Sequence, residues 1–184
     1  MTKRVLFVQG AGSEGSHQVD AHLVESLREH LGSGYSVRYP KLPNEAKPDL
    51  ETWKRIIVDE VAAMGDHGFL VGHSIGASVA MKALADGEVG RTLAGMFLIA
   101  APFWHDDKVW RWDEARLPED LAARVPRELP LFLYQGREDE VVPSAHLAMY
   151  AHALPHAIVR RLGGRDHQLS NDLTEVARDL RSLG

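Results

Sequence analysis

Three side chains have the types and the order along the chain that nucleophilic catalysis requires: Ser74, Asp139 and His167. A serine hydroxyl is a weak nucleophile until a base takes its proton, and histidine is the most frequent base. The histidine needs a carboxylate beside it, which fixes its tautomer and stabilises the imidazolium that forms. The sequence therefore predicts a Ser-His-Asp triad, provided that the fold brings these positions together.

Ser74 lies in the segment Gly-His-Ser-Ile-Gly at positions 72–76, directly after an apolar run at 69–71. Residues 79–84 continue with apolar side chains at helical spacing, so the region predicts a strand, a sharp turn and a helix. Such a strained turn, a nucleophile elbow, exposes the serine hydroxyl. Glycine is expected at its two outer positions, where side chains would collide as strand and helix approach. The apolar flanks argue against a simple glycine-bearing turn with a surface serine.

The predicted acid and base each follow a later strand. Asp139 comes after the apolar run 131–134, and His167 comes after the apolar residues 157–159. The interval between Asp139 and His167 has room for one helix and one strand. Two glycines at 163–164 allow the loop of His167 to approach its neighbours closely.

Three other acids lie close to the predicted triad in the sequence. Glu138 and Glu140 flank Asp139, but they would point elsewhere on the turn. Asp166 precedes His167 and cannot easily reach the ring of its own neighbour. Asp139 is therefore the predicted partner of the histidine.

A glycine-rich loop follows the first predicted strand. The strand is expected at residues 5–8, and residues 10–15 read Gly-Ala-Gly-Ser-Glu-Gly. Such a loop can point a backbone N–H, here that of Ala11, at the carbonyl oxygen that Ser74 attacks. The loop would then supply one half of an oxyanion hole.

The same loop also fits the pattern G-x-G-x-x-G of dinucleotide-binding proteins, which place a pyrophosphate at the following helix. That interpretation requires an acid at the end of the second strand to hold the ribose. The second strand is predicted at 35–39, and no acid ends it. Arg38 and Lys41 could still hold a 2′-phosphate, so the dinucleotide alternative stays open.

Apolar runs and helical periodicities alternate along the chain. Val19, Leu23, Leu27 and Leu31 recur every four residues and predict a helix at 17–31. Asp49 is expected to cap a helix at 50–64, and Ser144 is expected to cap a later one. A further strand is predicted at 96–101, and a last helix carries apolar residues from 173 to 180. Alternation predicts a parallel sheet with helices on both faces, and reactive loops gather at the carboxyl ends of its strands.

Residues 103–128 differ in character from the rest of the chain. Three tryptophans stand among many charged residues, and we interpret the segment as a small lid inserted before the fifth strand. Its aromatic rings would either line a substrate pocket or fill the core of the lid itself. The residues predicted to line a pocket are Gly12, His73, Phe103, Trp104, Trp110, Trp112 and Val141.

Composition excludes several classes of function. The chain has 184 residues, which suggests one domain, and it has no cysteine, which removes disulfides and thiolate chemistry. The net charge of -5 gives no basic footprint for nucleic acid. The histidines at 146, 152 and 156 are not at metal-ligand spacing, so no metal is expected. No leader or membrane span is evident, and we expect a cytoplasmic protein whose oligomeric state, monomer or homodimer, the sequence leaves open.

Together these features resemble an α/β hydrolase, and in detail the small serine hydrolases related to retinoblastoma-binding protein 9. The resemblance rests on a chain that begins directly at a strand and glycine-rich loop, on Gly-x-Ser-x-Gly, on Ala-Pro-Phe-Trp at 101–104, and on the later Asp and His. One departure is Gln9, where many α/β hydrolases have histidine. The resemblance implies a three-layer fold with six parallel strands in the order 2-1-3-4-5-6. It also implies Ser74, Asp139 and His167 as the triad, with the N–H groups of Ala11 and Ile75 as the oxyanion hole.

The expected function is hydrolysis of a small ester or amide through an acyl-enzyme, in the manner of a carboxylesterase and without a cofactor. Two alternatives remain at this point. One is a catalytically weak protein that keeps the fold for binding, since fold alone does not establish activity. The other is a dinucleotide-binding oxidoreductase.

Overall fold

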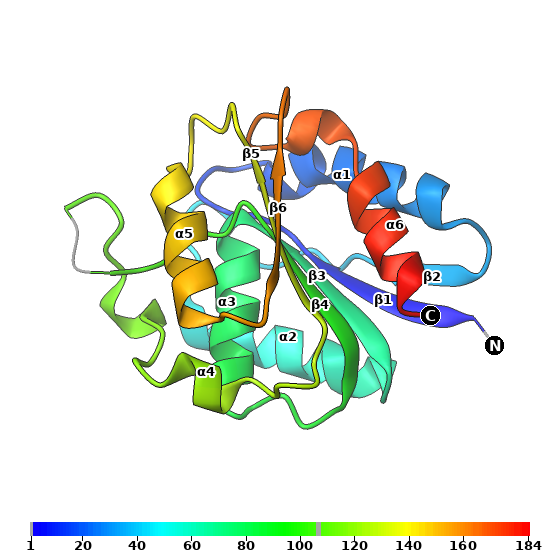
Figure 1. Ribbon diagram of the computed structural model, residues 1–184, viewed down its shortest axis with the longest axis horizontal. Helices are drawn as coiled ribbons and strands as arrows, with labels where there is room; N and C mark the ends of the chain where they lie inside the picture. The colour runs from blue at the N-terminus through cyan, green and yellow to red at the C-terminus, as the bar shows by residue number, and fades with distance from the viewer. Residues whose placement is uncertain (1, 106–107) are drawn as a thin grey trace.

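Six strands form one parallel sheet in the residues that the computed structural model describes, 2–105 and 108–184 (Figure 1). Their order is β2-β1-β3-β4-β5-β6, which confirms the predicted architecture. The strands are β1 Lys3–Val8, β2 Tyr35–Arg38, β3 Gly68–His73, β4 Leu93–Ile99, β5 Leu131–Gly136 and β6 Ile158–Leu162. All neighbouring strands are parallel, so every strand ends at the same edge of the sheet.

Helices connect the strands and cover both faces of the sheet (Figure 1). They are α1 Ser16–Leu31, α2 Leu50–Met64, α3 Ser74–Ala85, α4 Leu121–Arg124, α5 Ser144–Ala153 and α6 Thr174–Ser182, with short 3-10 turns η1 Asp113–Ala115 and η2 Leu169–Asn171. Helices α1 and α6 lie on one face, while α2, α3 and α5 lie on the other. The result is the expected three-layer arrangement.

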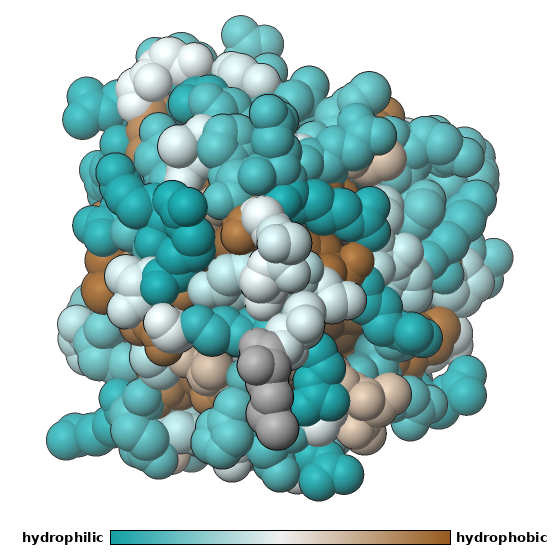
Figure 2. Space-filling view, turned by 90° about the vertical axis from the view of Figure 1, so that its right-hand side faces the viewer, coloured by the Kyte–Doolittle hydropathy of each residue, from teal (hydrophilic) through white to brown (hydrophobic). Residues whose placement is uncertain are grey.

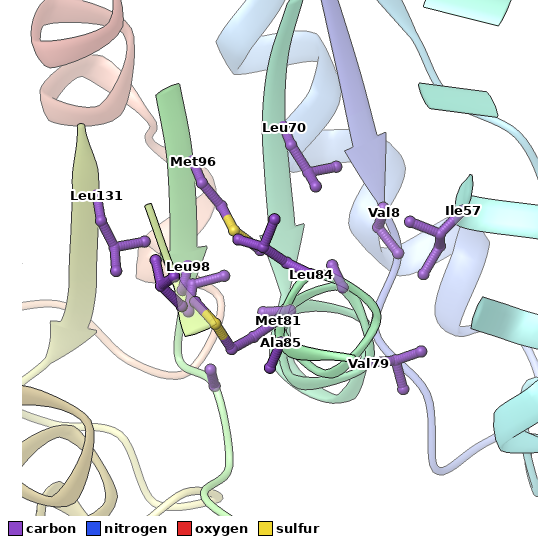
Figure 3. Close-up of a cluster of buried hydrophobic side chains, with 14 of the residues drawn as sticks. Val8, Ile57, Leu70, Val79, Met81, Leu84, Ala85, Met96, Leu98 and Leu131 are labelled. Atoms are coloured by element: carbon purple, nitrogen blue, oxygen red, sulfur yellow. The ribbon is translucent and has the colours of Figure 1, made fainter. Parts of the chain in front are cut away.

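Residues of the strands alternate between two hydrophobic cores. In β1, Val5 and Phe7 pack with the helices α1 and α6, whereas Leu6 and Val8 pack with α2 and α3. Figure 3 shows the second core, in which Leu70 and Met96 of the sheet approach α3. Strands buried on both faces explain why the sequence shows continuous apolar runs there. The face of α1 and α6 that Figure 2 presents is mostly hydrophilic, with small hydrophobic patches.

The structure confirms one predicted helix cap and corrects a second predicted cap and one predicted strand end. The Asp49 side chain accepts a hydrogen bond from the Thr52 N–H at 2.8 Å, which confirms its predicted capping role. The prediction for Ser144 was wrong: it is the first residue of α5, and its side chain makes no capping bond. Pro143 takes the cap position instead, and its carbonyl accepts the N–H of His146. Strand β4 ends at Ile99, before the predicted 101, because the next residue has a φ of +50°.

The insert between β4 and β5 packs beside α3. In its described residues, 103–105 and 108–128, regular structure is confined to η1 and α4. Its buried residues Ala115, Leu121 and Val125 belong to the same core as α3. Among the described residues, no helix has the length and apolar character that crossing a membrane would require.

Candidate active site

Ser74 is held in a strained turn at the junction of β3 and α3. It is the first residue of α3, and its φ is +52°, in the left-handed region that non-glycine residues rarely adopt. A turn of this kind is retained only where the surrounding structure enforces it, and such strain clusters at functional sites. The strand, the sharp turn and the helix predicted from the sequence are therefore all present.

The two glycines of the elbow are required by close packing. A Cβ at position 72 would lie 2.6 Å from the Cα of Ala77, and one at position 76 would lie 1.9 Å from the carbonyl oxygen of Gln9. The second contact is between α3 and the end of β1, so Gly76 allows Ser74 to sit beside the glycine-rich loop. The predicted reason for both glycines is confirmed.

Replacing Gly76 with alanine should separate α3 from the end of β1. The overlap with a backbone oxygen cannot be relieved by a rotamer change, so we expect a loss of about 1–3 kcal/mol or more in unfolding free energy. Urea unfolding measures this loss. Gly90→Ala is the matched control, since a Cβ there meets no atom within 4 Å and should leave stability nearly unchanged. Equal stability of the two variants would contradict the role assigned to Gly76.

His167 connects Ser74 to Asp139. Its Nε2 lies 3.1 Å from the Ser74 Oγ, and its Nδ1 lies 3.1 Å from each carboxylate oxygen of Asp139. A carboxylate can only accept, so Nδ1 carries the proton and Nε2 is left to accept the serine hydroxyl. The three residues that the sequence singled out thus form a continuous hydrogen-bonded chain.

The environment of Asp139 keeps it ionised. Burial raises the pKa of this carboxyl, but the hydrogen bond and charge of His167, together with two backbone hydrogen bonds, bring the pKa below its usual range. The N–H groups of Val141 and Val142 add to the effect, each donating to Oδ1 at 2.9 Å. An anion at this position favours a positive charge on the histidine during proton transfer.

The neighbouring acids have other tasks. The Glu138 carboxylate accepts the N–H of Arg165 at 2.9 Å, and the Asp166 carboxylate accepts the N–H of Ser170 at 2.7 Å. A Cβ at Gly136 would lie 2.0 Å from the Arg165 carbonyl oxygen, so glycine is needed where the His167 loop meets β5. These contacts hold the loop against the end of the strand.

A cavity of about 320 Å³ lies beside Ser74. Its walls are the glycine-rich loop, the first turns of α1, Val141 and the loop of His167. Ala11 lines it, and no acceptor among the described residues takes the Ala11 N–H. Ile75 is the second residue of α3, so no earlier turn of the helix supplies an acceptor for its N–H. Within the described part of the chain, both predicted oxyanion donors are thus without a helical or loop acceptor.

The predicted pocket residues divide into two groups. Gly12, His73 and Val141 line the cavity. None of the four aromatic residues of the insert lines it, and these are Phe103, Trp104, Trp110 and Trp112.

The aromatic rings of the insert instead pack together beside α3. The indole N–H of Trp104 donates to the Ser78 Oγ at 3.0 Å, and its ring meets those of Trp110 and Trp112. Trp104 belongs to the core shared with α3, and only 8% of it is exposed. In this conformation the tryptophans fill a packed layer, one of the two possibilities that the sequence left open.

Sequence reasoning missed several residues that line the cavity. Val19 begins the apolar stripe of α1, yet it is 49% exposed and lines the cavity, as do Ser16, Asp20 and Gln168. The sequence partly indicates these residues, because the first turn of a helix that follows a glycine-rich loop must face that loop. The period of four alone could not show where the buried stripe ends.

The N-terminus of α1 is occupied by Glu45. Its carboxylate accepts the N–H groups of Gly15 and His17, each at 2.8 Å, and the side-chain amide of Gln9 at 3.0 Å. These backbone donors are the ones that a pyrophosphate would need. Arg38, the candidate for a 2′-phosphate, pairs with Glu60. The structure therefore disfavours the dinucleotide alternative, and Gln9 supports the loop through Glu45.

Replacing Glu45 with glutamine should destabilise the protein at neutral pH. Hydrogen bonds from the His17 and Gly15 N–H groups hold the pKa of this carboxyl below its usual range. A lowered folded pKa means that the stabilisation is present above the unfolded pKa and is lost as pH falls through the folded value. The difference in unfolding free energy between wild type and Glu45→Gln should therefore become smaller as the pH is lowered. Thermal unfolding from neutral to acid pH measures it, with the exposed Glu14→Gln as control; a pH-independent difference would contradict this role.

Comparisons with known proteins agree with this architecture. A family model described as serine hydrolase matches residues 6–171. The ydeN gene product of B. subtilis is similar in structure, with a TM-score of 0.75 and 17% identity over 99% of this chain and 98% of that chain. The esterase domain of a Rhodothermus marinus protein has a TM-score of 0.69 and 18% identity, over 99% of this chain and 88% of that chain. A Paleococcus ferrophilus monoacylglycerol lipase has a TM-score of 0.72 and 15% identity, over 100% of this chain and 96% of that chain. No curated protein sequence matches at a significant level. At these identities the structural similarities establish a shared fold.

Proposed function

The chain belongs to the serine hydrolase family and has the α/β hydrolase fold, and from this premise we propose that it hydrolyses a small carboxylic ester through an acyl-enzyme on Ser74. The observation that carries the proposal is the hydrogen-bonded chain from Ser74 through His167 to Asp139. This chain begins at a strained serine that faces a cavity. An activated serine of this kind is suited to acyl transfer.

The reaction proceeds in two acyl-transfer steps. The Ser74 Oγ attacks the substrate carbonyl carbon while His167 Nε2 takes the hydroxyl proton. The carbonyl oxygen becomes an oxyanion, which accepts hydrogen bonds from the N–H groups of Ala11 and Ile75. The tetrahedral intermediate collapses, and His167 gives its proton to the leaving alkoxide. Water then attacks the acyl-enzyme by the same route, with His167 as base, and releases the carboxylic acid and Ser74.

The cavity favours a small and uncharged substrate. Its volume of about 320 Å³ lies at the lower end of the range for ligand pockets. Val19 and Val141, both about half exposed, give its mouth an apolar character. The two fold relatives described as an esterase domain and a monoacylglycerol lipase support an ester rather than an amide. On this proposal the chain is one catalytic domain, and the insert 103–128 belongs to it as a segment whose described tryptophans pack beside α3.

Labelling with a fluorophosphonate probe, followed by mass spectrometry of peptides, tests the proposal. The probe phosphonylates a serine only where that serine is activated, so we expect one adduct, on Ser74. His167→Ala should remove the adduct and Asp139→Ala should slow its formation, in variants shown to be folded by circular dichroism. A folded wild-type protein that forms no adduct on Ser74 would overturn the proposal.

A further inference from the structure

A second histidine and carboxylate lie beneath the proposed triad. The His73 Nδ1 is 2.9 Å from Asp20 Oδ2, and each of the two side chains is only 2% exposed. Asp20 comes from α1 and His73 from the last position of β3, so the pair joins elements that are 53 positions apart in the chain. The proposed mechanism does not use either of them.

Both ring nitrogens of His73 face acceptors. Nδ1 faces the Asp20 carboxylate, and Nε2 lies 3.0 Å from the main-chain carbonyl oxygen of His167. A carbonyl oxygen can only accept, so Nε2 must carry a proton. Asp20 is itself committed as an acceptor, because Oδ2 takes the Gly10 N–H at 2.6 Å and Oδ1 takes the Gln168 side-chain amide at 3.2 Å. The arrangement is satisfied when His73 is an imidazolium and Asp20 a carboxylate.

The electrostatic environment favours the same charge state. Burial lowers the pKa of His73, but the charge and hydrogen bond of Asp20, the hydrogen bond to the His167 carbonyl and the charge of Asp139 together raise this pKa above its ordinary value. Burial raises the pKa of Asp20, but His73 and the hydrogen bonds from Gly10 and Gln168 together lower it below its usual value. The nearby Tyr39 hydroxyl donates to the His17 carbonyl oxygen at 2.8 Å, and burial, followed by the charges of Asp20 and Glu45, raises the pKa of this tyrosine.

The ion pair connects the two halves of the proposed site. Asp20 holds the N–H of Gly10, the residue before the oxyanion donor Ala11. His73 holds the carbonyl of His167, whose ring stands 4.9 Å from its own. One buried pair therefore restrains both the oxyanion loop and the loop that carries the proposed base.

We propose that Asp20 and His73 form a buried ion pair that positions the oxyanion loop and His167 relative to Ser74. The proposal rests on the function proposed above, and both residues are positioning residues, since neither touches the reacting atoms. Displacing reacting groups by about 1 Å can lower a rate by about 100-fold, so the loss of this restraint should have a large effect on the reaction rate. Because Asp20 cancels the charge of His73, the pair adds no net charge beneath the proposed base.

Two substitutions of His73 separate its two contacts. His73→Asn keeps a donor near the Nδ1 position, toward Asp20, and His73→Gln keeps one near the Nε2 position, toward the carbonyl of His167. We expect each to lower kcat/KM for an ester, and the rate of fluorophosphonate labelling, by about 10- to 100-fold, mainly through kcat. The loss should exceed that of Asp179→Asn, a control that disrupts another buried carboxylate, which is bonded to Tyr134 and Arg160 and is not part of the cavity lining.

Nitrogen-15 NMR of histidine-labelled wild-type protein tests the charge state independently of any variant's stability. At about pH 8, well above the ordinary histidine pKa of about 6.5, the His73 ring should remain an imidazolium. Its signal should be absent from His73→Gln and should become that of a neutral ring in Asp20→Asn. Because a raised folded pKa means that stabilisation is lost as pH rises through that value, the stability difference between wild type and His73→Gln should narrow in alkali.

The outcomes separate this role from the proposed function. A neutral His73 ring at about pH 8, or wild-type kcat/KM and labelling in both His73 variants, would overturn the positioning role while leaving the Ser74 chemistry intact. The positioning role would also be overturned if the His73 variants lost no more kcat/KM than Asp179→Asn does for an equal fall in unfolding midpoint. A wild-type protein that is not labelled at Ser74 would overturn the proposed function and this role together.

Discussion

Replacing Ser74 with alanine should lower ester hydrolysis by about 10⁴- to 10⁶-fold and leave the protein folded. The substitution removes one oxygen, the atom that forms the acyl-enzyme, and its one hydrogen bond is to His167. Alanine has the same Cβ as serine, so the strained φ of +52° costs both residues a similar energy. Binding in the cavity and the oxyanion donors stay in place, which accounts for the residual rate above that of water.

The measurement is kcat/KM with a short-chain chromogenic ester, together with thermal unfolding. Ser26→Ala is the matched control, because Ser26 is buried like Ser74, and its hydroxyl accepts the Leu173 N–H at 2.9 Å and takes no part in the proposed site. It should lose about 1 kcal/mol of stability and retain its activity. Undiminished turnover in Ser74→Ala would mean that another group is the nucleophile.

The parts of the structure that could be predicted are those determined by neighbouring residues. The strand before Ser74 is an uninterrupted apolar run because it is buried on both faces, and Gly72 and Gly76 are adjacent to the turn that requires them. The positions of Asp139 and His167 followed from a topological rule, that parallel strands end at one edge of the sheet. Such rules place loops together without any knowledge of side-chain packing.

Contacts between distant segments were outside the reach of these rules. Glu45 lies in a polar loop with several prolines, and nothing near it in the sequence indicates that it covers the N-terminus of α1. Asp20 lies on a helix with an apolar stripe, and its acid group gave no sign that it faces His73. Each contact depends on how a loop or helix packs at the carboxyl edge of the sheet. The alternative of a dinucleotide site stayed open for that reason until Glu45 was located.

The aromatic residues of the insert show a related limit. Their composition suits a pocket lining and a packed layer equally, and only the position of the segment distinguishes them. The insert lies beside α3, where Trp104 bonds Ser78, so its rings pack away from the cavity. Sequence periodicity carries no information about which side of a helix an irregular segment covers.

Replacing His167 with alanine should be nearly as damaging as replacing Ser74, and the two losses should not add. Without His167 the serine hydroxyl has no base within hydrogen-bond distance among residues 2–105 and 108–184, so we expect a loss of about 10⁴- to 10⁶-fold in kcat/KM. Asp139→Asn should cost less, about 10³- to 10⁴-fold, because the base remains but its Nδ1 loses the carboxylate that fixes the tautomer.

The decisive comparison is the double variant Ser74→Ala/His167→Ala. If both residues act only through one proton transfer, the first substitution already abolishes that transfer. The second substitution then causes no further loss of rate, and the double variant should hydrolyse ester at the rate of Ser74→Ala alone. Steady-state rates of the two single variants and the double variant measure this, at equal and verified folding. Losses that multiply would show that the residues contribute independently, and the hydrogen bond of 3.1 Å between them would then be structural and not the path of the proton.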